Sequence, residues 1–351
     1  MDYISILKRL STYAAVSGYE KDMAEQMKEL FGEYCDDVGI DKFYNVVAIK
    51  RGTGNGKYRI MITAHLDEIG FLVKSIDENG FLRLANIGGI DSKILLAQEV
   101  TVHGRDKIPG FIGAKPPHLL KPEETKKAVK MDDLYVDVGM NAEYVKNIIS
   151  IGDLITFKSE MNELQGGKLS GKTVDNRCGI AVLLGVMEEL TKVLHEIDVY
   201  FVATVQEETH CTGAETVSFN LEPDIAVIID ACHGDMPDAP KDETYPLGKG
   251  PAIAIGPNLH RKFTKKLMEI CKEENIPFQI DVEPDDTGTE AWITQVSRAG
   301  IPSLLVSIPV RYMHTTVETV DVQDIKNAAR AVAAFVKRLE PGREGIQCLS
   351  I

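Results

Sequence analysis

Two adjacent carboxylates, Glu207 and Glu208, stand where an apolar, β-prone run that begins at Val202 stops abruptly. In an open α/β sheet the carboxyl ends of the strands line the ligand crevice, so acids at such a point meet solvent and substrate. If strand geometry continues through the pair, the two side chains point to opposite faces, and one could bind a metal while the other reaches the substrate. An isolated Glu pair more often only caps a strand with charge. The interpretation therefore depends on the rest of the chain.

Ligand-type side chains recur at the ends of other predicted strands and at the start of a predicted helix. His65 ends an apolar strand, and Asp67 follows it at a spacing that lets a carboxylate orient the imidazole. The set that this placement brings to one edge of a parallel sheet is His65, Asp175, Glu207, Glu208, Asp230 and His314. Two imidazoles and several carboxylates without a set of thiolates suit Zn²⁺, Co²⁺ or Mn²⁺ with open positions for water. One carboxylate bridging two ions about 3.5–4 Å apart would give a hydrolytic site that acidifies water and polarises a substrate carbonyl.

The elements that must position these residues fall into three stretches. Residues 2–35 show the apolar spacing of two helices, and β-formers at 43–50 and 58–63 flank a turn-rich stretch, which predicts a hairpin-like pair of strands. From residue 69 to 164 the chain breaks into short β-rich pieces separated by Gly and Pro, which predicts a small all-β barrel or sandwich. After residue 164, strands alternate with helices, which predicts a largely parallel sheet.

The predicted fold is a three-layer α/β sandwich with a mostly parallel central sheet that carries an inserted small all-β barrel. In this division residues 1–68 and 165–351 form the catalytic domain, and residues 69–164 form the insert. A chain of 351 residues is long enough for a large core domain and a second module.

Composition and charge limit the classes of binding partner and the compartment in which we expect the protein. A formal net charge of −14 argues against nucleic acid or an anionic membrane as the main partner, since both need a basic surface, and it is compatible with cation binding. No apolar run approaches the length of a membrane span, and the N-terminal residues lack the pattern of a secretory signal. The six cysteines show no CxxC spacing, which suits free thiols in a reducing compartment. We expect a cytoplasmic protein.

Several ordered motifs resemble those of the M42 metallo-aminopeptidases, a family that includes glutamyl aminopeptidases, tetrahedral aminopeptidases and proteins once labelled endoglucanases. The resemblance spans nearly the whole chain, and the motifs that carry it are Ala64-His65-Leu66-Asp67-Glu68-Ile69-Gly70, Asp175-Asn176-Arg177, Gln206-Glu207-Glu208, Ile229-Asp230 and Arg311-Tyr312-Met313-His314. It implies that Asp175 bridges two divalent ions, Zn²⁺ first with Co²⁺ or Mn²⁺ as alternatives. It further places His65 and Asp230 on one ion and Glu208 and His314 on the other. Glu207 matches the family's general base, and Asp67 the acceptor that steadies His65.

The resemblance implies an aminopeptidase that removes N-terminal residues from peptides, working as a homo-oligomer in which dimers built through the inserted β domain assemble into a dodecamer. Other functions stay open from the residues alone. A metal-dependent deacylase or a carboxypeptidase-like hydrolase could use the same ligands. Polysaccharide hydrolysis is a remote alternative, because glycosidases use two carboxylates and usually no metal. A non-catalytic scaffold is disfavoured by the intact set of ligands.

Two segments depart from the family's pattern. Thr209-His210-Cys211-Thr212-Gly213-Ala214 replaces the usual Val-Gly followed by a residue and Arg-Gly-Ala, and Glu290 replaces the Asp of Gly-Thr-Asp-Ala. The first change concerns the wall that faces the substrate, and the second a loop that supports the site. A role in the pocket is open for His210, Cys211 and His233, which stand near the candidate ligands in sequence. The preferred N-terminal residue of a substrate and the physiological metal do not follow from the sequence.

Overall fold

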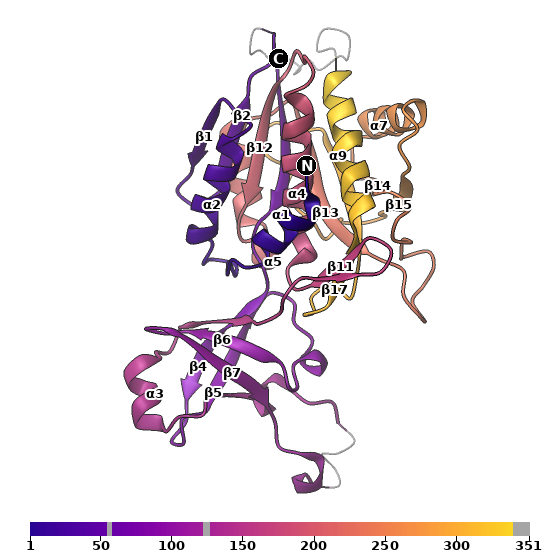
Figure 1. The fold of residues 1–351 in the computed structure, drawn as a ribbon. Coiled ribbons are helices and arrows are strands. Elements are labelled where there is room, and N and C mark those ends of the chain that lie inside the picture. The colour runs from indigo at the N-terminus through magenta and orange to yellow at the C-terminus, as the bar shows by residue number, and fades with distance from the viewer. Residues whose placement is uncertain (55–57, 122–126, 340–351) are drawn as a thin grey trace.

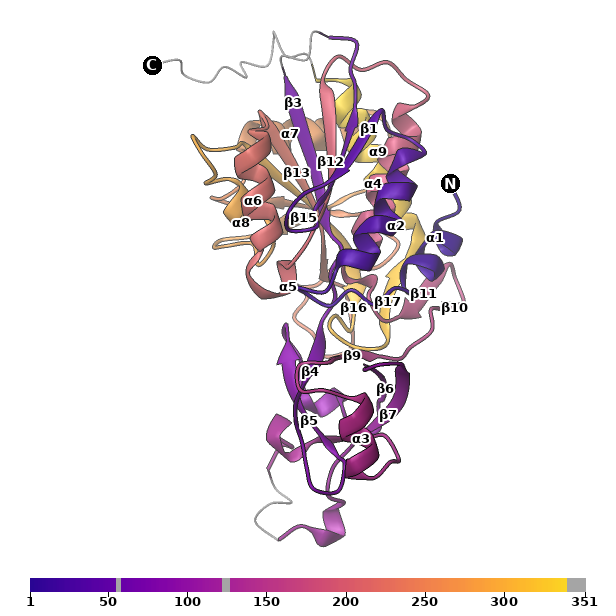
Figure 2. The ribbon, with the colours of Figure 1, turned by 90° about the vertical axis from the view of Figure 1, so that its left-hand side faces the viewer.

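The structure, a computed structural model, describes residues 1–54, 58–121 and 127–339. It has two parts, a large α/β body and a small β-barrel attached at one end of that body (Figure 1). A view turned by 90° shows helices on both faces of the large sheet (Figure 2). The expected α/β sandwich with an all-β barrel is therefore confirmed.

The large sheet is mixed, with parallel strands at its centre. Its order is β1-β2-β12-β3-β13-β16-β17-β11-β10, and β14 joins β15 to β16 beside this path. β3 runs parallel to β12 and β13, and β13 runs parallel to β16. Their carboxyl ends consequently meet at one edge of the sheet. The strands are β1 (Asp37–Ile40), β2 (Val46–Lys50), β3 (Arg59–His65), β10 (Asn162–Leu164), β11 (Lys168–Gly171), β12 (Asp198–Thr204), β13 (Ile225–His233), β14 (Ala252–Ile255), β15 (Gln279–Val282), β16 (Ser303–Arg311) and β17 (Glu318–Asp321).

Helices form a layer on each face of this sheet. One layer consists of α1 (Tyr3–Leu10), α2 (Lys21–Gly32), α4 (Val174–Leu190), α7 (Arg261–Glu273) and α9 (Val322–Lys337). The other contains α6 (Thr212–Leu221) and α8 (Ala291–Thr294). Side chains alternate between the two layers along the central strands, as the pleat requires: Ile60 and Ile62 of β3 join the first core and Met61 joins the second.

The predicted pairing of residues 43–50 with 58–63 is wrong. β12 lies between the two strands, antiparallel to β2 and parallel to β3. β3 is buried on both faces from Ile60 onward, as a central parallel strand is, whereas β2 is only half-buried and lies near the edge. The turn after β2 packs instead on the loop before β12, where the N–H of Thr53 donates to the backbone oxygen of His195 at 2.8 Å.

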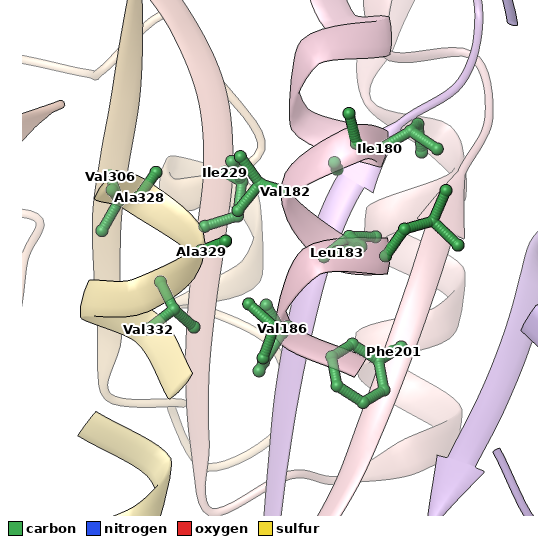
Figure 3. Close-up of a cluster of buried hydrophobic side chains, with 14 of the residues drawn as sticks. Ile180, Val182, Leu183, Val186, Phe201, Ile229, Val306, Ala328, Ala329 and Val332 are labelled. Atoms are coloured by element: carbon green, nitrogen blue, oxygen red, sulfur yellow. The ribbon is translucent and has the colours of Figure 1, made fainter. Parts of the chain in front are cut away.

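Helix α4 is the buried centre of the first layer. Nearly all of its residues are buried, which is typical of a helix that is apolar on every side. Figure 3 shows α4 beside α9, with side chains of both packed over the strands of the sheet. The labelled residues are Ile180, Val182, Leu183 and Val186 of α4, Phe201, Ile229 and Val306 of the sheet, and Ala328, Ala329 and Val332 of α9. Gly185 permits this packing, because a Cβ there would lie 2.8 Å from Cβ of Ala329. The packing holds the regular part of the helix, which begins directly after the non-helical residues Asp175 and Asn176.

The barrel closes in the order β4-β5-β8-β7-β6-β9 around its own apolar core. Its elements are β4 (Gly70–Ile76), β5 (Leu82–Ile87), η1 (Ser92–Ile94), β6 (Glu99–His103), β7 (Lys107–Gly113), η2 (Pro117–Leu119), η3 (Met131–Asp133), β8 (Tyr135–Asp137), α3 (Ala142–Ile148) and β9 (Leu154–Phe157). β10 follows the barrel and pairs with β11 in the large sheet. The domain limits given above, and a role of residues 69–164 in dimerisation, stay predictions.

Candidate active site

Five of the sequence-predicted ligands converge at the carboxyl edge of the large sheet. His65 ends β3, Asp230 lies in β13, and Asp175 lies in the first turn of α4. Glu208 lies in α5 (Glu207–His210), the short helix after β12, and His314 follows β16. The barrel begins at Gly70, directly after the His65 segment, so the cluster lies where the two parts of the molecule meet (Figure 1).

The cluster divides into two groups that share Asp175. Its Oδ1 lies 3.3 Å from Nε2 of His65, which is also 3.6 Å from Oδ1 of Asp230. Its Oδ2 lies 3.5 Å from Nε2 of His314, which is 3.3 Å from Oε2 of Glu208. Within each group the candidate donor atoms all lie within 4.8 Å of one another. Each oxygen of one carboxylate therefore faces a different histidine.

This arrangement fits divalent metal ions. Ligands about 2.0–2.1 Å from a tetrahedrally coordinated ion are about 3.3 Å from one another, close to the distances between these nitrogen and oxygen atoms. Oδ1 of Asp175 is buried and has no hydrogen-bond donor in the described part of the chain, so its lone pairs are available. The donors are imidazole and carboxylate only, as Zn²⁺, Co²⁺ and Mn²⁺ accept.

The charge balance of the cluster also suits a bound cation. Burial opposes protonation of His65, yet its contacts with Asp175 and Asp230 raise its pKa well above the ordinary value. Burial opposes protonation of His314 as well, and contacts with Asp175 and Glu208 raise its pKa to about 11. The two imidazoles are thus drawn to carry the positive charge that balances the carboxylates. Divalent ions would supply that charge in their place.

Glu207 lies beside the cluster and belongs to neither group of candidate ligands. Its Oε2 is 3.9 Å from Nε2 of His65, and burial raises the pKa of its carboxyl well above the ordinary value. Strand geometry, the condition under which Glu207 and Glu208 would point to opposite faces, does not continue through the pair. The strand ends at Thr204, Gln206 takes a left-handed conformation (φ 57°), and a helical turn begins at Glu207. In this turn both carboxylates face the histidines.

Asp67 joins this helical turn to His65. Its carboxylate is fully buried and accepts hydrogen bonds from the backbone N–H groups of Glu207 and Glu208, both at 3.1 Å. Nδ1 of His65 lies 3.5 Å from Oδ1 of the same carboxylate. The hydroxyl of Ser17 donates a further hydrogen bond of 2.5 Å to Oδ2. One buried side chain therefore positions both a candidate ligand and the Glu pair.

Three supporting residues were not found from the sequence. Ser17 and Glu20 come from the loop between α1 and α2, and Oε1 of Glu20 accepts the N–H of Gln206 at 3.0 Å. Glu318 is buried in β17, and its carboxylate accepts the N–H of Asp175 at 3.1 Å and that of His314 at 2.8 Å. An acid inside a short β-rich segment was the only sequence signal for Glu318. Ser17 contacts the side chain of Asp67, and Glu20 the backbone N–H of Gln206; both partners lie far along the chain, and no local pattern reveals such contacts.

The segments that depart from the family's pattern lie around the same cluster. The Sγ of Cys211 is 3.6 Å from Oε1 of Glu207. Glu290 is buried, accepts a hydrogen bond from the hydroxyl of Thr63, and has its pKa raised to about 7 by burial. His210 and His233 are exposed and belong to neither group of candidate ligands. A pocket role for these two histidines stays untested.

A family model described as M42 glutamyl aminopeptidase matches residues 45–330. The chain belongs to this family. A lysyl aminopeptidase from Pyrococcus furiosus is 31% identical over 96% of this chain and 97% of its own length. The fold is similar to that of an aminopeptidase from the archaeon Desulfurococcus kamchatkensis, with a TM-score of 0.92 and 36% identity over 99% of this chain and 98% of the other. The TET1 peptidase of Pyrococcus horikoshii, with a TM-score of 0.81 and 28% identity over 96% and 100% of the two chains, can assemble into a tetrahedron or a large octahedral shell.

Membership of the M42 family makes this chain a peptidase of the aminopeptidase class, an enzyme that hydrolyses peptide bonds. M42 peptidases are metallo-enzymes, and the two groups of histidines and carboxylates can hold a metal. Across the part of the chain that the structure describes, no helix has both the length and the apolar character needed to cross a membrane.

Proposed function

We propose that this M42 peptidase is a di-metal aminopeptidase that removes N-terminal residues from peptides. The observation that carries the proposal is the position of Asp175, whose two oxygens face His65 at 3.3 Å and His314 at 3.5 Å. A carboxylate shared in this way is what a bridged pair of ions needs. The proposal extends the aminopeptidase class of the family to a metal number and to residue roles.

Each ion has its own ligands in this proposal. His65 and Asp230 would hold one ion, Glu208 and His314 the other, and Asp175 both. Bound ions of this kind acidify water and polarise a substrate carbonyl. The other roles in the reaction belong to residues of the chain. We assign such roles to Glu207 and Asp67.

Glu207 acts as the general base. It lies beside the ligands without belonging to either group, so its carboxylate is free to take a proton from the attacking water and to return it to the leaving amine. Asp67 holds the N–H groups at the start of α5, and so fixes where Glu207 stands. By facing Nδ1 of His65 it also favours the tautomer whose Nε2 is the ligand atom.

The proposal includes a homo-oligomer that reaches a dodecamer, with Zn²⁺, Co²⁺ or Mn²⁺ as the metal and the cytoplasm as the location. Support for a homo-oligomer comes from the similarity to the Pyrococcus horikoshii peptidase, which can assemble into a tetrahedron or a large octahedral shell. The number of twelve is what the resemblance to the family implies. Light scattering of the purified protein tests it: a mass about twelve times that of the chain is expected, and a monomer at assay concentration contradicts it.

The test of the activity is a panel of aminoacyl p-nitroanilides, each with a free and with an acetylated amine. Enzyme freed of metal by a chelator is assayed alone and after addition of Zn²⁺, Co²⁺ or Mn²⁺. We expect no turnover by the chelated enzyme, recovery with at least one metal, and cleavage of the free-amine substrates only. The relative rates then rank the preferred N-terminal residue.

Other outcomes of the panel favour the alternatives. Metal-restored cleavage of the acetylated substrates would favour a deacylase or another hydrolase over the aminopeptidase. Activity that a chelator leaves intact would remove the metals from the mechanism. Polysaccharide hydrolysis would then become an alternative worth testing, because glycosidases usually need no metal.

A further inference from the structure

The loop that carries His314 touches the β-barrel next to the site. Nδ1 of His314 lies 2.8 Å from the backbone oxygen of Gly89, which follows strand β5 of the barrel. Two residues further along, the hydroxyl of Thr316 donates to Oε1 of Gln98 at 3.2 Å. The backbone oxygen of Thr316 accepts a hydrogen bond of 2.8 Å from the hydroxyl of Ser159. A candidate metal ligand of the large body is therefore fixed against the insert.

The barrel backbone can approach this closely because two successive residues lack side chains. A Cβ at Gly89 would lie 3.2 Å from Nδ1 of His314, and a Cβ at Gly88 would lie 3.4 Å from Oε2 of Glu208. Gly88 also has a φ of +81°, which L side chains rarely adopt. The turn at these glycines forms a wall of backbone against the group of Asp175, Glu208 and His314.

The two histidines of the site are supported from different parts of the molecule. Nδ1 of His65 faces Asp67 of the large body, whereas Nδ1 of His314 faces the carbonyl of Gly89 in the barrel. A carbonyl only accepts, so Nδ1 of His314 carries the hydrogen, and with an ion bound the neutral ring would present the lone pair of Nε2 to that ion. Partners of this kind fix the tautomer and the ring orientation of metal-binding histidines.

We propose that Gly89 is a positioning residue for His314, and that the ion held by Asp175, Glu208 and His314 depends on the docking of the barrel. The proposal rests on the ligand roles given under the proposed function. Disturbing the turn at Gly89 weakens this ion and leaves the ion at His65 and Asp230 in place. By linkage, binding of the dependent ion stabilises the docked barrel by the same free energy.

Metal titration of substituted proteins tests this selectivity. Gly89→Ala places a methyl group 3.2 Å from Nδ1 of His314, so the imidazole must shift by a few tenths of an ångström. Gly89 has no positive φ, and the substitution therefore brings no backbone strain of its own. We expect the Kd of one ion to rise about 10- to 100-fold, the usual effect of losing such a partner, and that of the other to change little. Equilibrium dialysis of chelated full-length protein against Zn²⁺ or Co²⁺ measures both constants.

Three further variants distinguish the positioning role of Gly89 from a general effect on metal binding. Gln98→Ala removes the neighbouring contact without adding bulk, and should weaken the same ion less. Gly32→Ala is the matched control, since a Cβ there meets no atom of the described residues within 4 Å, and it should bind both ions as the parent does. His314→Ala should abolish one ion. If His314→Ala kept both ions, the ligand assignment itself would be wrong. Normal binding in Gly89→Ala, or an equal loss of both ions, would overturn the positioning role alone.

Hydrogen exchange gives a second readout that does not depend on activity. Linkage requires that amides of residues 86–98 exchange more slowly when the metal is bound, in the parent and in Gly32→Ala. In His314→Ala this slowing should vanish. If the exchange rates of the amides of residues 86–98 in the parent protein were the same with and without metal, the coupling between barrel docking and the ion would be contradicted.

Discussion

The Sγ of Cys211 lies 3.6 Å from Oε1 of Glu207, in contact with the proposed general base. Burial raises the pKa of this thiol, so it stays protonated and can donate a weak hydrogen bond to the carboxylate. Cys211 itself has a left-handed backbone (φ 53°) at the junction of α5 and α6, which directs its side chain back to Glu207. The departure from the family's pattern at this position therefore touches the reacting group.

Replacing Cys211 should lower the turnover number without changing the metal content of the enzyme. Cys211→Ala removes the donor, and we expect kcat to fall about two- to tenfold, the value of one such hydrogen bond. Cys211→Ser keeps a donor and should stay closer to the parent. Steady-state kinetics and metal analysis of the three proteins make the comparison. An alanine variant as active as the parent would show that the contact does not position Glu207.

Glu207→Gln keeps the shape of the proposed base and removes its ability to accept a proton. Because general bases contribute about 10²- to 10⁴-fold to rate, kcat should fall by that factor while the metal content stays at the parent level. The exposed Glu25→Gln in α2 is the control and should be fully active. A Glu207→Gln enzyme with parental kcat would exclude the base assignment.

Asp175 should be needed for the binding of both ions, and Asp230 for the binding of one. Asp175 belongs to both groups of candidate ligands, whereas Asp230 belongs only to the group of His65. We expect Asp175→Ala to retain almost no metal and Asp230→Ala to retain about half of the parental amount. Mass spectrometry of metal in dialysed protein measures this. Equal metal loss in the two variants would argue against a bridging carboxylate.

Asp324 should make stability depend on pH. Its carboxylate accepts the N–H of Gly248 at 2.6 Å and that of Gly250 at 2.7 Å, and burial raises its pKa from 3.8 to about 6. Between pH 4 and 6 the folded chain thus holds a proton that the unfolded chain has released. The contribution of Asp324 to the free energy of unfolding therefore falls as pH rises through this window, by at most about 3 kcal/mol, and levels off above it.

Asp324→Asn cannot titrate and isolates this effect. Urea unfolding of both proteins under chelation, at pH 4, 5, 6 and 7, gives the difference in stability at each pH. The advantage of the parent over the variant should be largest at pH 4 and should shrink towards pH 6. A difference that does not change with pH would show that Asp324 does not bind a proton more tightly in the folded chain.

Local sequence patterns were sufficient to predict those features of the site and the fold that depend on a single strand or helix. The end of the apolar run at His65 and the acids after β12 were visible because the run of apolar residues gives way there to polar ones, and parallel strands then bring their carboxyl ends together. The same patterns predicted the barrel from short β-rich pieces. They failed for the neighbours of β3, because a strand buried on both faces takes the partners that best cover its edges, wherever these lie in sequence.

The sequence by itself determined the kind of site: which residues are candidate ligands, that they are imidazoles and carboxylates, and that they stand at strand ends or at the start of a helix. The tertiary structure decided the pairing of Asp175 with both histidines, the turn that aims Glu207 and Glu208 the same way, and the support of His314 by Gly89. The reason is physical. Side-chain chemistry belongs to the residue type, but every residue has a backbone carbonyl, and only the fold determines which one meets a given imidazole.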